Sequence, residues 1–162
     1  MKRGVEATTT VHAPFEGVRT VLSEEPAIVM AGDLPAPERR SRQFRSDLGV
    51  DLPTGGAIRK AVDIEVGPLE SANGTASVRL SWRASGRDRL FPVFDGHLEI
   101  RPEGNDATRL RVHGTYTVPL GPVGRFGDGL VGRRIARQSF ESFLEDTAAR
   151  LDAEVHRRSA TV

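Results

Sequence analysis

Residues 121–129 read GPVGRFGDG, and they separate the two segments whose patterns decide the fold. Before them, residues 108–119 alternate between apolar and polar side chains, which predicts a β-strand. After them, residues 130–155 carry an unbroken helical pattern. A long amphipathic helix that follows a series of hairpin strands needs a curved sheet to pack against, and such an arrangement often encloses a pocket.

The predicted C-terminal helix has one apolar face. At about 1.5 Å per residue it is roughly 40 Å long, comparable to a strand of about ten residues at about 3.3 Å each. Charged residues such as Arg137, Glu141 and Glu145 lie mostly off the apolar stripe. The stripe consists of Ile135, Phe140, Phe143, Leu144, Ala148, Leu151 and Val155. The helix can therefore span the sheet and bury this stripe against it.

The two strands before this helix fit together as a hairpin. Strands are predicted at residues 90–101 and 108–118, with a turn at 103–106. The predicted register places every residue opposite a residue of the same face, and a shift by two residues would keep the faces as well. In the predicted register the inner pairs are Ile100–Leu110, Leu98–Val112, Gly96–Gly114 and Phe94–Tyr116, and the outer pairs are Glu99–Arg111 and His97–His113. One apolar face and one charged face predict an antiparallel sheet that is covered on one side.

The rest of the chain adds further strands and short helices. Strands are also predicted at residues 5–11, 39–50, 58–66 and 76–84. Pro14 begins a short helix, residues 26–30 add another turn, residues 32–38 are predicted to be a loop, and residues 73–74 mark a turn. We therefore predict one domain over residues 1–162 with an α+β fold. A curved antiparallel β-sheet of about six or seven strands wraps on the long C-terminal α-helix, with short helices after the first strand.

Gly96 and Gly114 lie directly opposite each other on the apolar face of the predicted hairpin. The absence of two side chains at this point allows the sheet to bend strongly. It also leaves room for a ligand bounded by Phe94, Tyr116 and Trp82. Both explanations stay open at this point, and they are compatible with each other.

Composition and charge exclude several classes of protein. The 162 residues carry 23 basic and 22 acidic side chains, a formal net charge of +1, so no overall charge attracts nucleic acid or an anionic membrane. The chain has no cysteine, which excludes disulfides and thiolate metal sites. No segment approaches the ~20 apolar residues of a membrane span, and the N-terminus lacks the apolar region of a signal peptide. We expect a cytoplasmic protein without stable membrane insertion, as a monomer or homodimer.

Three stretches of the chain match one known arrangement. VHAPFEGV at residues 11–18 looks like an opening strand and first helix, residues 90–100 with 108–116 look like a late hairpin, and residues 121–134 lead into a closing helix. Together they resemble the START-like or SRPBCC superfamily, whose members share the helix-grip fold. The sequence differs from common members at residues 27–33, where a tryptophan often occurs. The resemblance implies a cavity between the sheet and the long helix that binds hydrophobic small molecules, and only some branches of the superfamily are enzymes.

Apolar and aromatic side chains of the strands and the last helix are expected to line this cavity. The predicted ligand-binding residues are Val62, Leu80, Trp82, Phe94, Gly96, Gly114, Tyr116, Ile135 and Phe143. Burial of apolar ligand surface would supply the binding energy, at about 25 cal/mol per Å². We expect a lipid-like or polyketide-like partner, no cofactor and no metal.

Two alternatives stay open beside simple binding. An enzyme of the polyketide aromatase/cyclase type would use the same cavity, with Tyr116 or an inward arginine to orient or protonate the substrate. A protein-interaction module with a filled core would act through residues 39–45, RRSRQFR, a pattern that is also typical of a charged edge strand. The sequence contains no G-x-S-x-G and supports no Ser-His-Asp arrangement, so it identifies no catalytic residues.

Three smaller features have a functional and a structural interpretation. GDGLVG at residues 127–132 matches G-x-G-x-x-G, but no strand follows its helix, so we interpret it as a flexible start of the helix and not as a nucleotide site. The His97–His113 pair is interpreted as exposed and polar, because no third metal ligand is fixed. Lys60 shares a face with Val62 and is expected to reach water from near the strand end.

Overall fold

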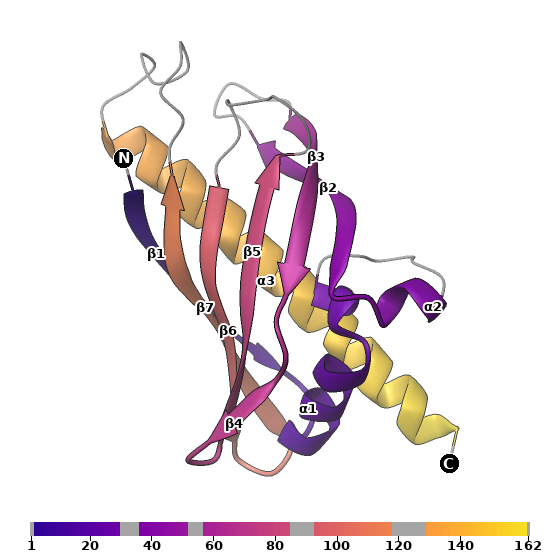
Figure 1. Ribbon diagram of the computed structural model, residues 1–162. Coiled ribbons are helices and arrows are strands. Elements are labelled where there is room, and N and C mark those ends of the chain that lie inside the picture. Colours follow the sequence, from indigo (N-terminus) through magenta and orange to yellow (C-terminus); the bar gives the residue numbers. More distant parts are fainter. Residues whose placement is uncertain (1, 30–35, 52–56, 85–92, 118–128, 162) are drawn as a thin grey trace.

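The computed structural model describes residues 2–29, 36–51, 57–84, 93–117 and 129–161. Figure 1 shows a curved sheet with one long helix, α3, running across one of its faces. The helical elements are α1 (Phe15–Glu24), the 3-10 helix η1 (Pro26–Val29), α2 (Ala36–Arg39) and α3 (Gly129–Ala160). The strands are β1 (Lys2–Val11), β2 (Gln43–Asp51), β3 (Ala57–Val66), β4 (Glu70–Ala72), β5 (Thr75–Ala84), β6 (Val93–Glu103) and β7 (Ala107–Thr117).

The described strands form one antiparallel sheet in which the first strand lies beside the last. Their order is β1-β7-β6-β5-β3-β2, and β4 pairs with the start of β5 while β3 pairs with its end. The short helices α1 and α2 lie at the end of the sheet that the C-terminal half of α3 crosses (Figure 1). This is the α+β helix-grip arrangement that the sequence predicts.

The register predicted for the last hairpin is confirmed. Leu98 is the Cα partner of Val112, Gly96 that of Gly114 and Phe94 that of Tyr116, and the outer pairs follow the same offset. Alternation excludes a shift by one residue, which would turn every apolar side chain of a strand toward water, whereas a shift by two would keep the faces. We call the face of the sheet that is turned toward α3 the inner face, and the opposite one the outer face.

The core lies between the inner face and the apolar stripe of α3. Leu144 and Leu151 of the helix are fully buried, and so are Leu80, Leu98 and Leu110 of the sheet. Full burial of one such side chain contributes about 1.5–3 kcal/mol. The apolar stripe therefore holds α3 across the sheet, as its periodicity predicts.

The structure differs from the prediction mainly at the ends of elements. α2 forms within the predicted loop at residues 32–38, because proline fits the first turn of a helix. β2 accordingly begins at Gln43 and not at residue 39. α3 continues past Val155 to Ala160, since Glu154 forms ion pairs with residues three and four positions further along. The predicted strand residues 90–92 lie outside the described ranges.

Hydrogen bonds from α3 hold η1 in place. Thr147 Oγ1 donates to the carbonyl oxygen of Val29 at 2.8 Å, and Arg150 Nη1 donates to the same oxygen at 2.9 Å. Burial lowers the pKa of the Arg150 guanidinium. These bonds satisfy a carbonyl group that would otherwise be buried without a partner, and they connect the segment after α1 to the long helix.

Candidate functional site

Aromatic side chains from the sheet and from α3 meet at the inner face. Trp82 of β5 stacks on Phe94 of β6, with ring centroids 4.4 Å apart and planes inclined by 28°. Phe140 of α3 packs against both rings, with its centroid 5.4 Å from that of Trp82 and 5.0 Å from that of Phe94. Aromatic pairs of this kind contribute about 0.5–1.5 kcal/mol beyond their buried area. The three rings therefore join two neighbouring strands to the helix.

Two further rings complete what we call the aromatic cluster: Trp82, Phe94, Tyr116, Phe140 and Phe143. The centroid of Tyr116 lies 6.3 Å from that of Phe140, and the centroid of Phe143 lies 5.8 Å from that of Trp82. Phe143 is half-buried, whereas the other four side chains are buried. Within the cluster, solvent therefore reaches Phe143 most easily.

Local sequence explains why these rings converge. Trp82 is the Cα partner of Phe94, and Phe94 is also the Cα partner of Tyr116, so three strands place their rings in one row. Alternation turns that row toward the inner face. Phe140 and Phe143 are three residues apart on α3, a spacing that places both on the same side of the helix.

The glycine pair lies beneath the Phe94 ring. A β-carbon built on Gly114 would lie 2.5 Å from the carbonyl oxygen of Asp95 and 3.0 Å from Cε2 of Phe94. The backbones of β6 and β7 thus approach too closely here for a side chain, which is what strong bending requires. The space above the two glycines is occupied by the Phe94 ring, so a ligand would have to displace that ring to use it.

The structure brings together most of the side chains predicted to line the cavity. Trp82, Phe94, Tyr116 and Phe143 belong to the aromatic cluster, and Val62 and Leu80 are fully buried on the same face. Ile135 lies on α3, but its side chain is outside the described part of the chain, as is that of Lys60. Phe140 was not among the predicted lining residues although it contacts three of them. Its place on the apolar stripe is the signal that could have identified it.

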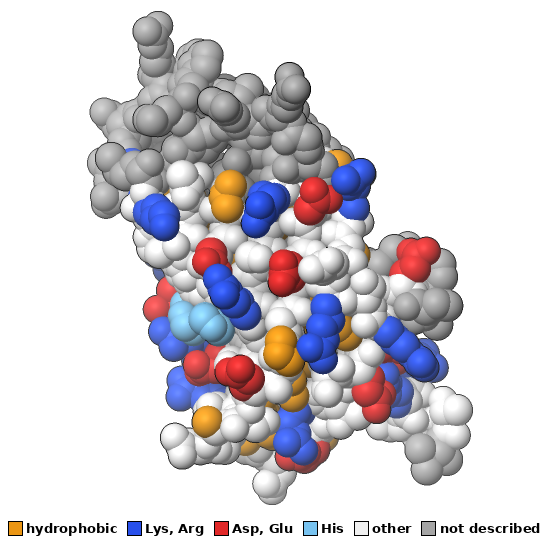
Figure 2. All heavy atoms as spheres, viewed as in Figure 1, with side chains coloured by type: hydrophobic (Ala, Val, Ile, Leu, Met, Phe, Trp, Pro, Cys, Tyr) orange, Lys and Arg blue, Asp and Glu red, His pale blue; other side chains and the backbone are white. Residues whose placement is uncertain are grey.

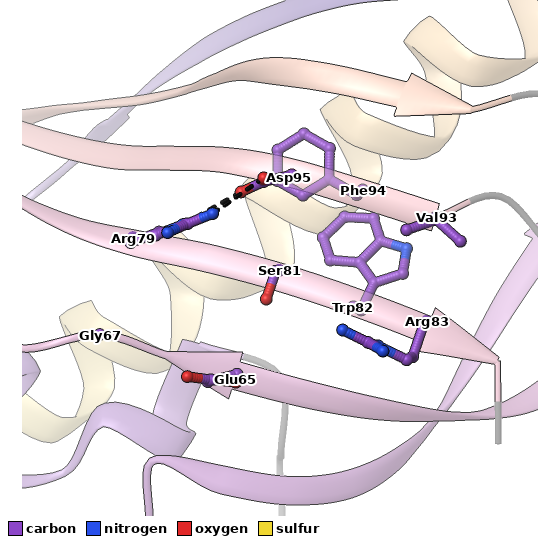
Figure 3. Close-up of a pocket in the computed structure, with 9 residues that line it drawn as sticks. All are labelled: Glu65, Gly67, Arg79, Ser81, Trp82, Arg83, Val93, Phe94 and Asp95. Carbon is purple, nitrogen blue, oxygen red and sulfur yellow. Dashed lines mark hydrogen bonds and ion pairs between the residues drawn. The ribbon is translucent and has the colours of Figure 1, made fainter. Parts of the chain in front are cut away.

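A hollow of about 250 Å³ lies on the other side of the sheet, where Arg79, Ser81 and Asp95 point away from α3. Figure 3 shows Arg79 and Asp95 reaching toward each other across β5 and β6. Arg79 Nε and Nη2 donate to the two carboxylate oxygens of Asp95 at 3.1 and 2.9 Å. This pair holds the pKa of Asp95 below its ordinary value. The hollow presents paired charges on the outer face, and it shares Trp82 and Phe94 with the predicted apolar site.

The arginine-rich segment lies at the surface. Arg40, Arg42 and Arg45 are exposed, and Arg45 forms an ion pair with Asp63 at 3.0 Å. Phe44 instead packs against the core. None of these three arginines therefore points into the space between the sheet and α3.

In the ranges that the structure describes, no helix combines the length and apolar character needed to cross a membrane. No protein-family model matches the sequence, and no curated protein matches it.

Solved structures with similar folds show which fold this chain has. A START superfamily protein from Mycobacterium smegmatis superposes with a TM-score of 0.54 at 20% identity, over 95% of this chain and 97% of that one. A conserved protein from Geobacillus kaustophilus gives a TM-score of 0.57 at 11% identity, over 97% and 96% of the two chains. The di-domain ARO/CYC protein StfQ from the steffimycin biosynthetic pathway gives 0.53 at 16% identity, over 99% of this chain and 53% of StfQ. The chain therefore has a START-like fold of the helix-grip type, as its sequence predicts.

Proposed function

We propose that this protein binds a hydrophobic or aromatic small molecule, lipid-like or polyketide-like, between the inner face of the sheet and α3. The observation that carries this proposal is the aromatic cluster, in which rings from three neighbouring strands and from the helix converge. The fold supports the proposal as well, because similar folds occur in a START superfamily protein and in an ARO/CYC protein.

The rings of the cluster contact one another, so a ligand enters by moving some of them. Phe140 and Phe143 are the rings that α3 contributes, and Phe143 already reaches solvent. A ligand that separates these two rings from Trp82 replaces ring contacts with ligand contacts. Any further apolar surface that the ligand buries then contributes about 25 cal/mol per Å² to the free energy of binding.

Tyr116 favours a second candidate, a reaction of the aromatase/cyclase type in the same place. Tyr116 is 5% exposed and its ring points inward, so its phenol would contact a substrate that is shielded from water. A phenol in that position orients a carbonyl group by hydrogen bonding or transfers a proton to it. Turnover of an aromatic-polyketide precursor would distinguish this enzyme from a carrier. The variant Tyr116→Phe should then abolish turnover while it still binds the precursor.

The chain contains one tryptophan, Trp82, which serves as the reporter of binding. Titration with the apolar fluorophore anilinonaphthalene sulfonate should transfer excitation energy from Trp82 to the probe and saturate at one probe per chain. Native mass spectrometry of protein purified from its own host should show a copurifying apolar molecule. No saturable transfer and no copurifying molecule would instead support an interaction module with a filled core.

Two variants locate the probe. Phe143→Ala should weaken saturable uptake, because it removes a ring of the cluster that is only half-buried and so leaves the fold intact. Val93→Ala is the matched control, since Val93 is an apolar side chain that is 44% exposed. Uptake that is the same in both folded variants would contradict the proposed site.

A further inference from the structure

Two histidines lie opposite each other on the outer face, and the binding site proposed above uses neither. His97 of β6 and His113 of β7 are Cα partners, and their rings stack with centroids 5.7 Å apart and planes inclined by 21°. His97 is exposed and His113 is half-buried. Figure 2 shows histidine side chains, in pale blue, on this face among acidic and basic groups.

The spacing of the two rings suits one shared metal ion. Two imidazoles that bind an ion at about 2.0–2.1 Å from each nitrogen have ring centroids roughly 5–6 Å apart when the angle at the metal is tetrahedral or somewhat wider. The χ2 torsion of histidine is soft, and rotation about it leaves the centroid nearly in place, because the centroid lies close to the Cβ–Cγ axis. One nitrogen of each ring can therefore face a common point, from strands that hold the two residues in register.

Carboxylates neutralise the two basic groups that lie nearest to the histidine pair. The charged groups on this part of the outer face are Arg79 of β5, Asp95, Glu99 and Arg101 of β6, Arg109 and Arg111 of β7, and Glu6 and Lys2 of β1. The guanidinium groups of Arg79 and Arg111 each donate to two carboxylate oxygens. Arg79 is paired with Asp95 as described above, and Arg111 donates to both oxygens of Glu6 at 3.1 Å. Within the described residues Glu99 forms no ion pair, so its negative charge is left beside the histidines.

The protonation state of His113 also suits a metal. Burial, the Arg111 guanidinium and the neighbouring His97 all lower the pKa of its imidazole. The ring is therefore neutral at neutral pH, which is the form that coordinates metal ions.

Although the sequence alone predicts no metal here, the geometry of the pair leads us to propose that His97 and His113 form a binding site for a divalent transition-metal ion, with water completing the coordination and Glu99 close by. No group of three or more His, Cys, Asp or Glu side chains within the described ranges is placed to hold an ion, so the proposed site rests on the two imidazoles. Imidazole nitrogen selects Ni²⁺, Cu²⁺ or Zn²⁺, whereas Mg²⁺ requires oxygen ligands.

Calorimetric titration of the untagged protein with NiCl₂ at neutral pH tests the site. We expect binding of Ni²⁺ to this pair and no heat with MgCl₂. The double variant His97→Asn/His113→Asn should lose this binding. The matched control is His12→Asn/His156→Asn, because the chain has four histidines and each double variant keeps two. Ni²⁺ binding that survives in the first variant, or that falls equally in both, would overturn the proposal.

A second measurement needs no variant. In proton NMR spectra of the wild-type protein, a substoichiometric amount of Cu²⁺ should broaden the Hε1 signals of His97 and His113 before those of His12 and His156. Equal broadening of all four signals, or earlier broadening of the other two, would contradict the site even if a variant failed to fold.

Discussion

At Gly96 the sheet leaves no space for a β-carbon. A methyl group built there would lie 2.2 Å from the carbonyl oxygen of His113, a backbone atom that cannot turn aside, whereas one built on Gly4 would meet nothing within 4 Å. We therefore expect Gly96→Ala to lower the free energy of unfolding by about 1–3 kcal/mol. Gly4→Ala, the matched control in another strand, should leave it unchanged or raise it slightly, since glycine weakens a strand. Urea denaturation measures both values, and equal stability of the two variants would show that β6 and β7 are not this close.

Glu154 is a buried carboxylate between two arginines. Hydrogen bonds from Arg157 and Arg158 lower its pKa from the ordinary value of 4.5 to about 2. Because the folded-state pKa lies below the unfolded one, the ionised group adds stability above pH 4.5, and this contribution is lost as the pH falls toward 2. Glu154→Gln should therefore melt at a lower temperature than wild type at neutral pH, and the two melting temperatures should converge in acid.

The exposed ion pair of Arg137 with Glu141 on the same helix provides the control for this pH dependence. Glu141→Gln should change the free energy of unfolding by less than about 1 kcal/mol at neutral pH, because water screens the pair. A difference between Glu154→Gln and wild type that stays constant from neutral pH to about pH 2 would contradict the assigned pKa.

At the scale of elements, one hydroxyl group joins η1 to α3. Thr147 is fully buried, and its Oγ1 lies 2.8 Å from the Val29 carbonyl oxygen and 2.9 Å from that of Phe143. Thr147→Val keeps the shape of the side chain but leaves the Val29 carbonyl with one donor fewer, so we expect a loss of about 1 kcal/mol. Thr20→Val in α1 removes a similar bond, to the Glu16 carbonyl oxygen, from an exposed position and should be nearly neutral. Thermal denaturation of the two variants side by side tests this difference.

Periodicity predicts elements and faces well, and neighbours in the sheet poorly. Alternation is a local property, so it predicts that Trp82, Phe94 and Tyr116 point inward and limits β6 and β7 to registers that keep their faces. The position of β1 beside β7 depends on the path of the whole chain. For this reason the sequence pairs Arg111 with Glu99 across the hairpin, whereas its guanidinium binds Glu6 of β1.

The same limit applies to the candidate site. The apolar stripe identifies the side of α3 that faces the sheet, but it does not tell which turn of the helix lies over which strand. Phe143 was therefore predicted to line the site while Phe140, which touches Trp82, Phe94 and Tyr116, was not. The hollow beside Arg79 and Asp95 could not be predicted either, because it forms where three separate strands meet.

For the molecule as a whole, the order of the strands predicts where the fold opens first. β6 and β7 each have a strand on both sides, and α3 lies along β1, whereas β2 is an edge strand that pairs with β3. Local opening of β2 therefore breaks one row of hydrogen bonds between strands, whereas opening of β6 or β7 breaks two. We expect its amide protons to exchange at least about tenfold faster than those of β6 and β7, which corresponds to about 1.4 kcal/mol.

Hydrogen exchange followed by NMR measures these rates strand by strand, and β1 is the internal control because it is the other edge of the same sheet. If the grip of α3 stabilises that edge, β1 should exchange more slowly than β2 although each pairs with a single neighbour. The variant Phe140→Ala should speed up exchange in β1 and β7 more than in β2, since it loosens the helix where Tyr116 of β7 meets it. Equal protection of both edges, unchanged in this variant, would mean that strand pairing alone and not the helix holds the sheet.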